Sequence, residues 1–313
     1  MAGIVFIMIA CLTWALDTLI RYPLLGQGFS TLQIVLFEHL TLVLVTSPLL
    51  WRYRHHFMQM NSTQSAALFF IGGVGSALGT LAFTQAFHYL NPTIVILLQK
   101  LQPLVAILLA SWWLKERIHG YFIRWAGLIL LGSLVMIWPD VRHLAQANWY
   151  YANSTPDIIK GYSYTLLAVL AWGVATVCGK YLASEKMPAN AIMSGRFATG
   201  LMVLLPLALL YPASVQPMAT LSLGKLVMMA LLSGLLGMWL YYQGLKRIPA
   251  QLATLAEQTF PVFAAIINWL FLGMSLSSYQ IAGALLLVLG NIGLRFKEMH
   301  LPVQPGTASL NQA

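Results

Sequence analysis

The segments "ILLQKLQPLV" at residues 96–105 and "TLAEQTFPVF" at residues 254–263 each place a charged side chain inside a long apolar run. The charge is Lys100 in the first segment and Glu257 in the second. A charged residue at mid-bilayer costs about 2.5–3.5 kcal/mol on insertion scales, so it persists where it faces protein or water. The two segments therefore indicate a polar cavity inside a bundle of membrane helices.

The composition of the chain is that of a membrane protein. Of its 313 residues, 59% are hydrophobic and 8% are charged, and the mean hydropathy is +0.77. A soluble domain carries roughly 25% charged residues. The formal charge of +9 comes from basic residues that stand singly at the ends of apolar runs. This pattern favours a topology signal in the bilayer over nucleic-acid binding, so the expected fold class is an all-α integral membrane protein.

Ten transmembrane helices are predicted, each near the length of about 20 residues that crosses a bilayer. A polar connection at 139–160 separates a first five-helix repeat, 1–138, from a second, 161–298, and residues 299–313 are expected to be a disordered C-terminal tail. The predicted spans cover 3–21, 32–50, 66–88, 92–114, 121–138, 161–181, 190–211, 225–245, 250–272 and 278–295.

The distribution of lysine and arginine predicts the orientation. With the N-terminus inside, eleven of the 17 basic residues lie at cytoplasmic ends, four lie at the opposite ends, and Lys100 and Arg196 lie within spans. The excess of positive charge on one side predicts that both termini are cytoplasmic. The expected location is a bacterial inner (plasma) membrane, with the first span retained in the mature protein because no basic region precedes it.

The chain repeats itself at a constant shift of 158 residues. Five-span copies contain an odd number of crossings, so the second copy enters the membrane the opposite way up. Two inverted five-helix repeats are a known transporter architecture, with the substrate site at their interface near the midplane. The matched residues include Trp14 with Trp172, Thr18 with Thr176, Pro48 with Pro206, Gly79 with Gly237, Gln85 with Gln243 and Pro103 with Pro261.

These features resemble an EamA-type member of the drug/metabolite transporter superfamily. The marks are the tryptophan in the first span of each copy, Arg196 in "GRF", the two mid-span prolines, and "LKERI" at 114–118. The resemblance covers roughly residues 3–295 and implies a ten-helix fold and solute transport. The sequence departs from the repeated pattern at Glu38, which stands where Arg196 would repeat, and at Met274, which stands where Glu116 would repeat.

Helical periodicity selects the residues expected to bind the substrate. In the ninth span, polar and small residues recur at intervals of three and four, which places them on one face. The same shift applied to the fourth span gives a similar face, with Lys100 one position away. An alternative is that Lys100 and Glu257 pair and only hold the copies together. The candidate substrate-binding residues are Lys100, Glu257, Gln99, Trp14, Trp172, Thr254, Asn268, Pro103 and Pro261.

Four further residues inside spans are candidates for gating or coupling: Asp17, Glu38, His39 and Arg196. Other interpretations stay open for two of them. Asp17 can pair with Arg21 one helical turn later, and Arg196 can extend to the inner surface. Packing in the core is the alternative for the aromatic residues.

The predicted function is secondary transport by alternating access. We expect an exporter or exchanger of a small polar metabolite such as an amino acid or related zwitterion, in contact with the lipid bilayer, and leave a homodimer open. Neither a nucleotide-binding motif nor a cofactor or metal site is predicted. The rival hypothesis is an intramembrane enzyme with Glu38, His39 or Lys100 as acid or base; the absence of HExxH and GxSxG from the sequence weighs against it.

Overall fold

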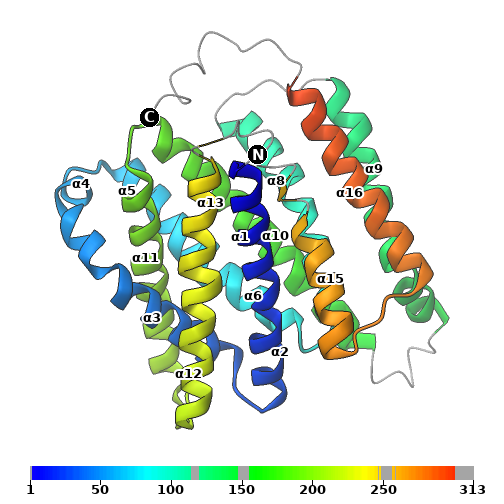
Figure 1. Cartoon of the computed structure of the whole chain (residues 1–313), viewed down its shortest axis with the longest axis horizontal. Helices are drawn as coiled ribbons and strands as arrows, with labels where there is room; N and C mark the ends of the chain where they lie inside the picture. Colours follow the sequence, from blue (N-terminus) through cyan, green and yellow to red (C-terminus); the bar gives the residue numbers. More distant parts are fainter. Residues whose placement is uncertain are drawn as a thin grey trace.

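The computed structural model describes residues 2–113, 120–146, 155–245, 247, 256–257 and 259–299, which are helices joined by turns, with no strand among them (Figure 1). The predicted site residue Thr254 and the "LKERI" segment at 114–118 lie outside the described residues.

The helices follow the chain in two comparable series. The first contains α1 (Ala2–Leu16), α2 (Thr18–Gly26), α3 (Thr31–Arg52), α4 (Arg54–Met58), α5 (Ser62–Phe69), the π-helical η1 (Phe70–Leu78), α6 (Gly79–Ala86), α7 (Pro92–Leu98), the 3₁₀ turn η2 (Gln99–Leu101), α8 (Gln102–Trp113) and α9 (Gly120–Gln146). The second contains α10 (Thr155–Ser184), α11 (Ala189–Leu210), the 3₁₀ turn η3 (Pro212–Ser214), α12 (Thr220–Met229), the π-helical η4 (Ala230–Leu236), α13 (Gly237–Leu245), α15 (Thr259–Leu272) and α16 (Ser278–Met299).

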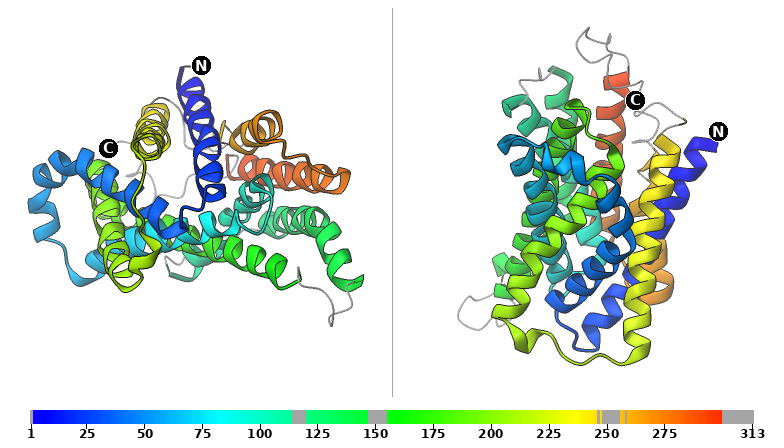
Figure 2. Two further views of the ribbon diagram at one scale, coloured as in Figure 1. Left: turned by 90° about the horizontal axis from the view of Figure 1, so that it is seen from below. Right: turned by 90° about the vertical axis from the view of Figure 1, so that its left-hand side faces the viewer.

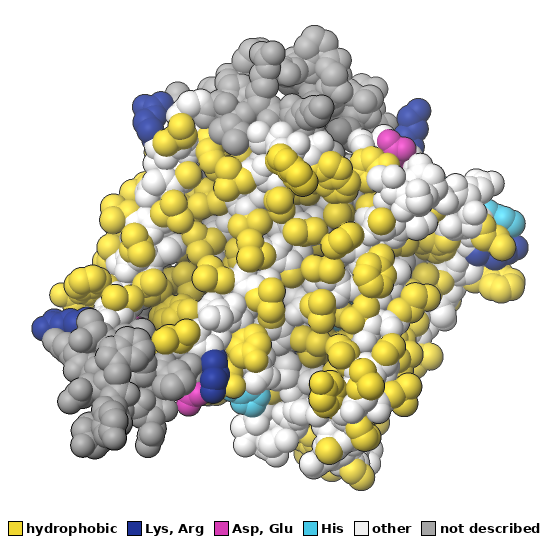
Figure 3. Space-filling view, turned by 180° about the vertical axis from the view of Figure 1, so that it is seen from behind, with side chains coloured by type: hydrophobic (Ala, Val, Ile, Leu, Met, Phe, Trp, Pro, Cys, Tyr) yellow, Lys and Arg dark blue, Asp and Glu magenta, His cyan; other side chains and the backbone are white. Residues whose placement is uncertain are grey.

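Many of these helices are long and apolar enough to cross a bilayer. Within the described residues, eight helical stretches meet that standard and two shorter apolar helices, Thr259–Leu272 and Ser278–Gly293, accompany them. The outer surface agrees, because large apolar side chains such as Leu209 and Trp112 are 81% and 80% exposed. Figure 3 shows hydrophobic side chains spread over one whole face, with charged ones near its periphery. The chain is therefore an integral membrane protein.

Several helices begin at residues whose side chains cap the first turn. Ser30 accepts a hydrogen bond from the Gln33 backbone at the start of α3. Asn61 and Gln64 form a reciprocal capping box at the start of α5. Asn91 caps α7, and its successor Pro92 occupies the first helical position, where a missing N–H is harmless. Short polar sequence signals thus set where the helices start.

Several of the predicted spans, including the eighth with its π-helical η4, are interrupted rather than continuous. The first divides at Asp17 into α1 and α2, and the third contains the π-helical η1. The fourth changes to a 3₁₀ turn around Lys100 because Pro103 has no N–H to donate to the Gln99 carbonyl; the Gln102 N–H bonds to that carbonyl instead. Polar residues therefore lie at the points where the regular helix is broken.

The helices α9 and α10 both extend into the region expected to be a polar connection. α9 runs to Gln146 and α10 begins at Thr155, whereas the sequence placed a connection over 139–160. Hydropathy marks where a chain leaves the bilayer, and a helix can continue beyond that point into water. The two boundaries therefore differ by several residues.

Helices at equivalent positions of the two copies make reciprocal contacts. A Cβ built on Gly237 in α13 would lie 2.6 Å from Nε1 of Trp14 in α1. A Cβ built on Gly79 in α6 would lie 2.9 Å from Nε1 of Trp172 in α10. Each first-span tryptophan therefore packs on the third span of the other copy, where only glycine leaves room.

The neighbouring aromatic rings repeat this exchange. The ring centroids of Trp14 and Tyr241 are 5.6 Å apart, and those of Trp172 and Phe83 are 5.3 Å apart. Both pairs join a tryptophan to the residue four positions after the glycine that it covers.

The last helices of the two copies, α9 and α16, lie side by side at one edge of the molecule (Figures 1 and 2). A Cβ on Gly132 would lie 2.6 Å from the Leu287 nitrogen, and one on Gly290 would lie 2.7 Å from Cγ1 of Ile129. These two contacts also exchange when every number is shifted by 158. Glycine in both helices brings the two backbones together.

The end of the bundle where α2 finishes and α12 begins, below in Figure 1, is called here the lower end; the end where α1 begins is the upper end. An apolar cluster joins both copies near the lower end. Its fully or almost fully buried members include Leu24, Leu25 and Phe87 of the first copy and Leu226 and Met229 of the second. This cluster packs the lower end tightly.

Candidate functional site

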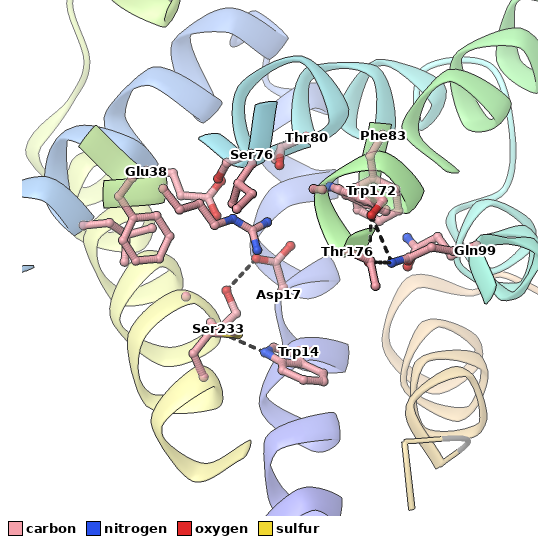
Figure 4. Close-up of a pocket in the computed structure, with 18 of the residues that line it drawn as sticks. Trp14, Asp17, Glu38, Ser76, Thr80, Phe83, Gln99, Trp172, Thr176 and Ser233 are labelled. Carbon is pink, nitrogen blue, oxygen red and sulfur yellow. Dashed lines mark hydrogen bonds between the residues drawn. The ribbon is translucent and has the colours of Figure 1, made fainter. Parts of the chain in front are cut away.

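A cavity of about 500 Å³ lies between the two copies. Its size is within the range of roughly 300–1,000 Å³ that is usual for small-molecule sites. Its walls combine charged, amide, hydroxyl and aromatic side chains (Figure 4), among them Trp14, Asp17, Thr18, Arg21, Glu38, His39, Ser76, Phe83, Gln99, Lys100, Gln102, Trp172, Thr176, Arg196, Ser233, Glu257 and Phe260.

Most of the residues predicted from the sequence meet in this cavity. The five that line it among the candidate substrate-binding residues are Lys100, Glu257, Gln99, Trp14 and Trp172, and the four candidate gating residues that line it are Asp17, Glu38, His39 and Arg196. Segments far apart in the chain thus bring their charges to one place.

Three other predicted residues are placed outside the cavity lining. Asn268 is fully buried in α15, where its Nδ2 donates to Oγ1 of Thr93 in α7 at 3.1 Å. Pro261 is buried in the same helix, and Pro103 is half-buried in α8. Asn268 therefore ties α15 to α7, and the prolines act on the backbone of residues that do line the cavity.

Arg21 is the centre of a buried ion-pair network. Its Nε lies 2.6 Å from Asp17 Oδ2 and its Nη2 lies 3.1 Å from Asp17 Oδ1, so the guanidinium grips this carboxylate with two bonds. The same Nη2 lies 2.9 Å from Glu38 Oε2 in α3. The pairing of Asp17 with Arg21 one turn away is confirmed, and Glu38 has a partner that its sequence neighbourhood did not suggest.

The network also reaches other helices. Nη1 of Arg21 donates to Oγ1 of Thr84 in α6 at 3.1 Å. The hydroxyl of Ser233, in η4 of the second copy, donates to Asp17 Oδ1 at 2.8 Å, and the indole N–H of Trp14 donates to the Ser233 carbonyl (Figure 4). Asp17 is thereby linked through Ser233 of the second copy to the ring of Trp14.

His39 is buried next to this network. Its Nδ1 lies 2.9 Å from the Val35 carbonyl, so this nitrogen carries the proton. Its Nε2 lies 3.0 Å from Oγ of Ser76 in η1 and accepts from that hydroxyl when the ring is neutral. His39 thus joins α3 to η1 through both of its ring nitrogens.

Lys100 and Glu257 meet through the backbone of the ninth span. Pro261 cannot donate to the Glu257 carbonyl, which instead accepts from the Phe260 N–H at 3.2 Å and from Nζ of Lys100 at 3.4 Å. Nζ also lies 5.8 Å from the centre of the Phe260 ring. The proline of one copy therefore frees an acceptor for the cation of the other.

An amide and aromatic wall faces these charges. Nε2 of Gln102 donates to Oγ1 of Thr176 at 3.0 Å and lies 3.5 Å from the Trp172 carbonyl. Figure 4 labels both Thr176 and Trp172. The Trp172 ring packs against Phe83. These side chains offer flat apolar surfaces beside hydrogen-bonding groups.

Sequence reasoning missed several lining residues, namely Arg21, Phe83, Gln102, Ser233 and Phe260. Arg21 was counted as a charge at a helix end. Its spacing from Asp17 gave the pair but not the approach of α3 and α6. Thr18 and Thr176 were available as a signal, because a polar residue repeated at the 158-residue shift within a span points to the shared interface.

A model of the EamA-like transporter family matches residues 1–138 and again residues 159–296. The chain belongs to the EamA-like transporter family. The family matches most of the chain and places it among transporters of small solutes rather than enzymes. The intramembrane enzyme considered from the sequence is therefore set aside.

Two further proteins are similar over nearly the whole chain. The riboflavin transporter ImpX of Fusobacterium nucleatum subsp. nucleatum (strain ATCC 23726 / VPI 4351) is 28% identical over 301 residues, which cover 93% of this EamA-like chain and 96% of that protein. A protein of known crystal structure, 16% identical, aligns with a TM-score of 0.62 over 96% of this chain and 99% of that one. The second likeness concerns the fold alone.

Proposed function

We propose that this chain is a secondary transporter that carries a small, polar, ring-containing solute of the riboflavin type by alternating access. The observation that carries the proposal is the cavity of about 500 Å³ between the two copies, lined by aromatic and amide side chains. The relative named as a riboflavin transporter supports this class of solute.

The reciprocal contacts support two inverted five-helix repeats and ten membrane spans. Trp14 on Gly237 and Trp172 on Gly79 exchange under one shift, as a two-fold relation between the copies requires. Such a relation, with an axis in the membrane plane, provides two states of similar energy that open to opposite sides. The count of basic residues supports placing both termini, and hence the upper end, in the cytoplasm.

The exposure of equivalent residues supports a state that opens at the upper end. Thr18 is 2% exposed and Arg21 is 3% exposed. Their counterparts are more accessible: Thr176 is exposed, and Gly179 is half-buried. A Cβ added to Gly179 would meet no atom within 4 Å. The cavity is thus sealed below by the apolar cluster around Leu24 and accessible from above.

The cavity walls suit a flavin ring. Riboflavin joins a planar heteroaromatic ring, with N–H and carbonyl groups along one edge, to a chain of hydroxyl groups. Trp14, Trp172 and Phe260 offer ring faces and edges for stacking. The amides of Gln99 and Gln102 can donate to ring carbonyls and accept from the ring N–H.

A zwitterion such as an amino acid, moved outward or by exchange, is the second candidate. Lys100 and Glu257 favour it, because a cation and a carboxylate line one cavity and can pair with the carboxylate and ammonium of such a solute. The two candidates differ in which side chains they require: the flavin depends on the aromatic wall and the zwitterion depends on the charged pair.

Counterflow in proteoliposomes separates these candidates. Vesicles containing the purified chain are preloaded with unlabelled riboflavin or with a mixture of amino acids, and uptake of labelled solute is measured. Saturable riboflavin counterflow supports the proposal, and its absence together with amino-acid counterflow overturns it in favour of the second candidate. Trp172→Ala should abolish the riboflavin signal, while Trp269→Ala, at a position 60% exposed and outside the cavity, should retain it.

A further inference from the structure

The Arg21 network contains two carboxylates and one guanidinium. Asp17 and Glu38 both lie within 3 Å of Arg21, and the side chains of Arg21, Asp17 and Glu38 are only 4%, 13% and 11% exposed. When both acids are ionised, these three groups carry one surplus negative charge away from bulk water. A buried surplus charge is costly, and binding a proton removes it.

The other charged or titratable groups that face this network come from two helices. Arg196, in α11, is a further cation that acts electrostatically on Glu38 and offsets part of the negative charge of these three groups. His39 follows Glu38 in α3, and both of its ring nitrogens are engaged by the Val35 carbonyl and the Ser76 hydroxyl. Thr84 of α6 and Ser233 of η4 contribute hydroxyl groups, which do not titrate in the accessible pH range. Of the groups in the network itself, Asp17 and Glu38 are the two that can take up a proton.

The hydrogen bonds distinguish the two acids. Asp17 accepts two bonds from Arg21 and one from the Ser233 hydroxyl. Among the residues that the structure describes, Glu38 accepts a single bond, from Nη2 of Arg21. Hydrogen bonds to a carboxylate stabilise its charged form, and Glu38 is the acid that accepts fewer of them. Glu38 also lines the cavity, from which a water-borne proton can reach it.

We propose that Glu38 binds and releases one proton in each transport cycle, and so couples solute movement to the proton gradient. Hydronium in the cavity gives its proton to a Glu38 carboxylate oxygen, leaving water and a neutral carboxylic acid. The ion pair between Glu38 and Arg21 is lost, and Arg21 stays paired with Asp17. Release of the proton to water on the other side restores the observed network.

The position of the network explains how one proton can affect the cycle. Leu24 and Leu25 lie about one helical turn after Arg21 in α2, and both belong to the apolar cluster at the lower end. Asp17 is bonded to Ser233 in the other copy. Loss of the Glu38 contact removes an ionic tie between α3 and α2 just above this cluster. Protonation therefore loosens the end that must open in the opposite state.

The second copy has no equivalent acid at these positions. Ala175 and Gly179 stand where Asp17 and Arg21 would repeat, and Arg196 stands at the position of Glu38. The inference is thus for one proton site in each chain rather than two, with a coupling of one proton for each solute.

The test rests on the proposed function and uses proteoliposomes with a pH-sensitive dye inside and riboflavin as the solute. In the wild-type protein, uptake of riboflavin should change the lumenal pH in proportion to the solute moved, and an imposed pH gradient should drive accumulation. Glu38→Gln should move no protons with any solute that it carries. Glu38→Asp, which keeps a titratable acid, should retain the pH change, as should the control Glu185→Gln at an exposed site.

The outcomes separate the two proposals. Riboflavin counterflow in the wild type without any lumenal pH change overturns proton coupling but leaves the proposed function intact. A pH change that persists undiminished in Glu38→Gln overturns the assignment to Glu38. Absence of counterflow for riboflavin is a failure of the proposed function instead.

A second measurement applies even if Glu38→Gln carries no solute. Infrared difference spectra of the purified protein between acid and neutral pH should contain the carbonyl stretch of a buried carboxylic acid. This band should be missing in Glu38→Gln and present in Glu185→Gln. An unchanged band in Glu38→Gln contradicts the proposal.

Discussion

The two ends of the cavity are built on equivalent backbone positions but carry different side chains. At the lower end, Asp17 and Arg21 form an ion pair that also holds Glu38. At the upper end, the equivalent positions are Ala175 and Gly179, opposite Arg196. One copy thus supplies a complete set of ion-pair partners and the other supplies small residues.

In the proposed arrangement of two inverted copies, this difference accounts for a cavity that is closed at its lower end. The helices of both copies pack by the same reciprocal contacts, so their backbones alone favour neither end. The lower end adds several charge-assisted bonds and an apolar cluster, whereas Gly179 at the upper end borders open space. In the proposed alternating-access cycle, side chains that differ between the copies therefore set the bias between the two states.

The largest expected effect comes from removing the centre of the lower network. Arg21→Met leaves two carboxylates buried without their cation, and breaking a buried pair in this way costs about 3–5 kcal/mol. We expect a loss of that order in the free energy of unfolding, measured by denaturant titration in detergent, and loss of transport. Arg142→Met, at an exposed position, should change stability by no more than about 0.5 kcal/mol. Equal stability of Arg21→Met and wild type would refute the role of the network.

Overfilling the tryptophan contacts should have the next largest effect. Gly237→Val and Gly79→Val each place a side chain against an indole less than 3 Å from the new Cβ. Overpacking of this kind costs about 1–3 kcal/mol. We expect similar losses in the two variants, because the contacts are reciprocal. Gly224→Val, with no atom within 4 Å of the added Cβ, is the control; a large loss in only one of the two variants would show that the copies are not packed alike.

A smaller effect is expected on binding when the aromatic wall is changed. Trp14→Phe keeps a ring but removes the indole N–H that donates to the Ser233 carbonyl. The smaller ring also offers less surface for stacking, and an aromatic pair contributes about 0.5–1.5 kcal/mol, so the dissociation constant for riboflavin should rise by about twofold to tenfold. Calorimetric titration measures this change, with Trp269→Phe as the matched control. Unchanged affinity would place Trp14 outside the binding surface.

The smallest effect is expected at the counterpart of Arg21. Gly179→Ala adds a methyl group that meets no neighbour and improves helix propensity by about 0.8–1.0 kcal/mol. We therefore expect equal or slightly higher stability in a thermal melt, in contrast to the loss in Arg21→Met. Marked destabilisation would show that the upper end is packed as closely as the lower end.

Sequence reasoning identified an all-helical membrane protein and most of the charged residues that line the cavity, because hydropathy and the charges inside apolar runs are properties of the chain alone. It also found the pairing of Asp17 with Arg21, which depends on helical spacing. It did not find the contact between Glu38 and Arg21, because that contact depends on how α2 and α3 approach each other. Helical spacing predicted that Asn268 and Pro261 share one face of their helix. It did not predict that Asn268 contacts Thr93 in α7, because that contact depends on how α15 and α7 pack.

The most direct test of the central claim, that the two copies cross the membrane in opposite directions, is sided thiol labelling of one equivalent pair. Ser62 and Thr220 are exposed first residues of α5 and α12, separated by the repeat shift, and both native cysteines are buried. Ser62→Cys and Thr220→Cys are labelled separately in sealed, oriented vesicles with a membrane-impermeant maleimide. The account predicts labelling from opposite sides of the membrane; labelling of both positions from the same side would contradict it.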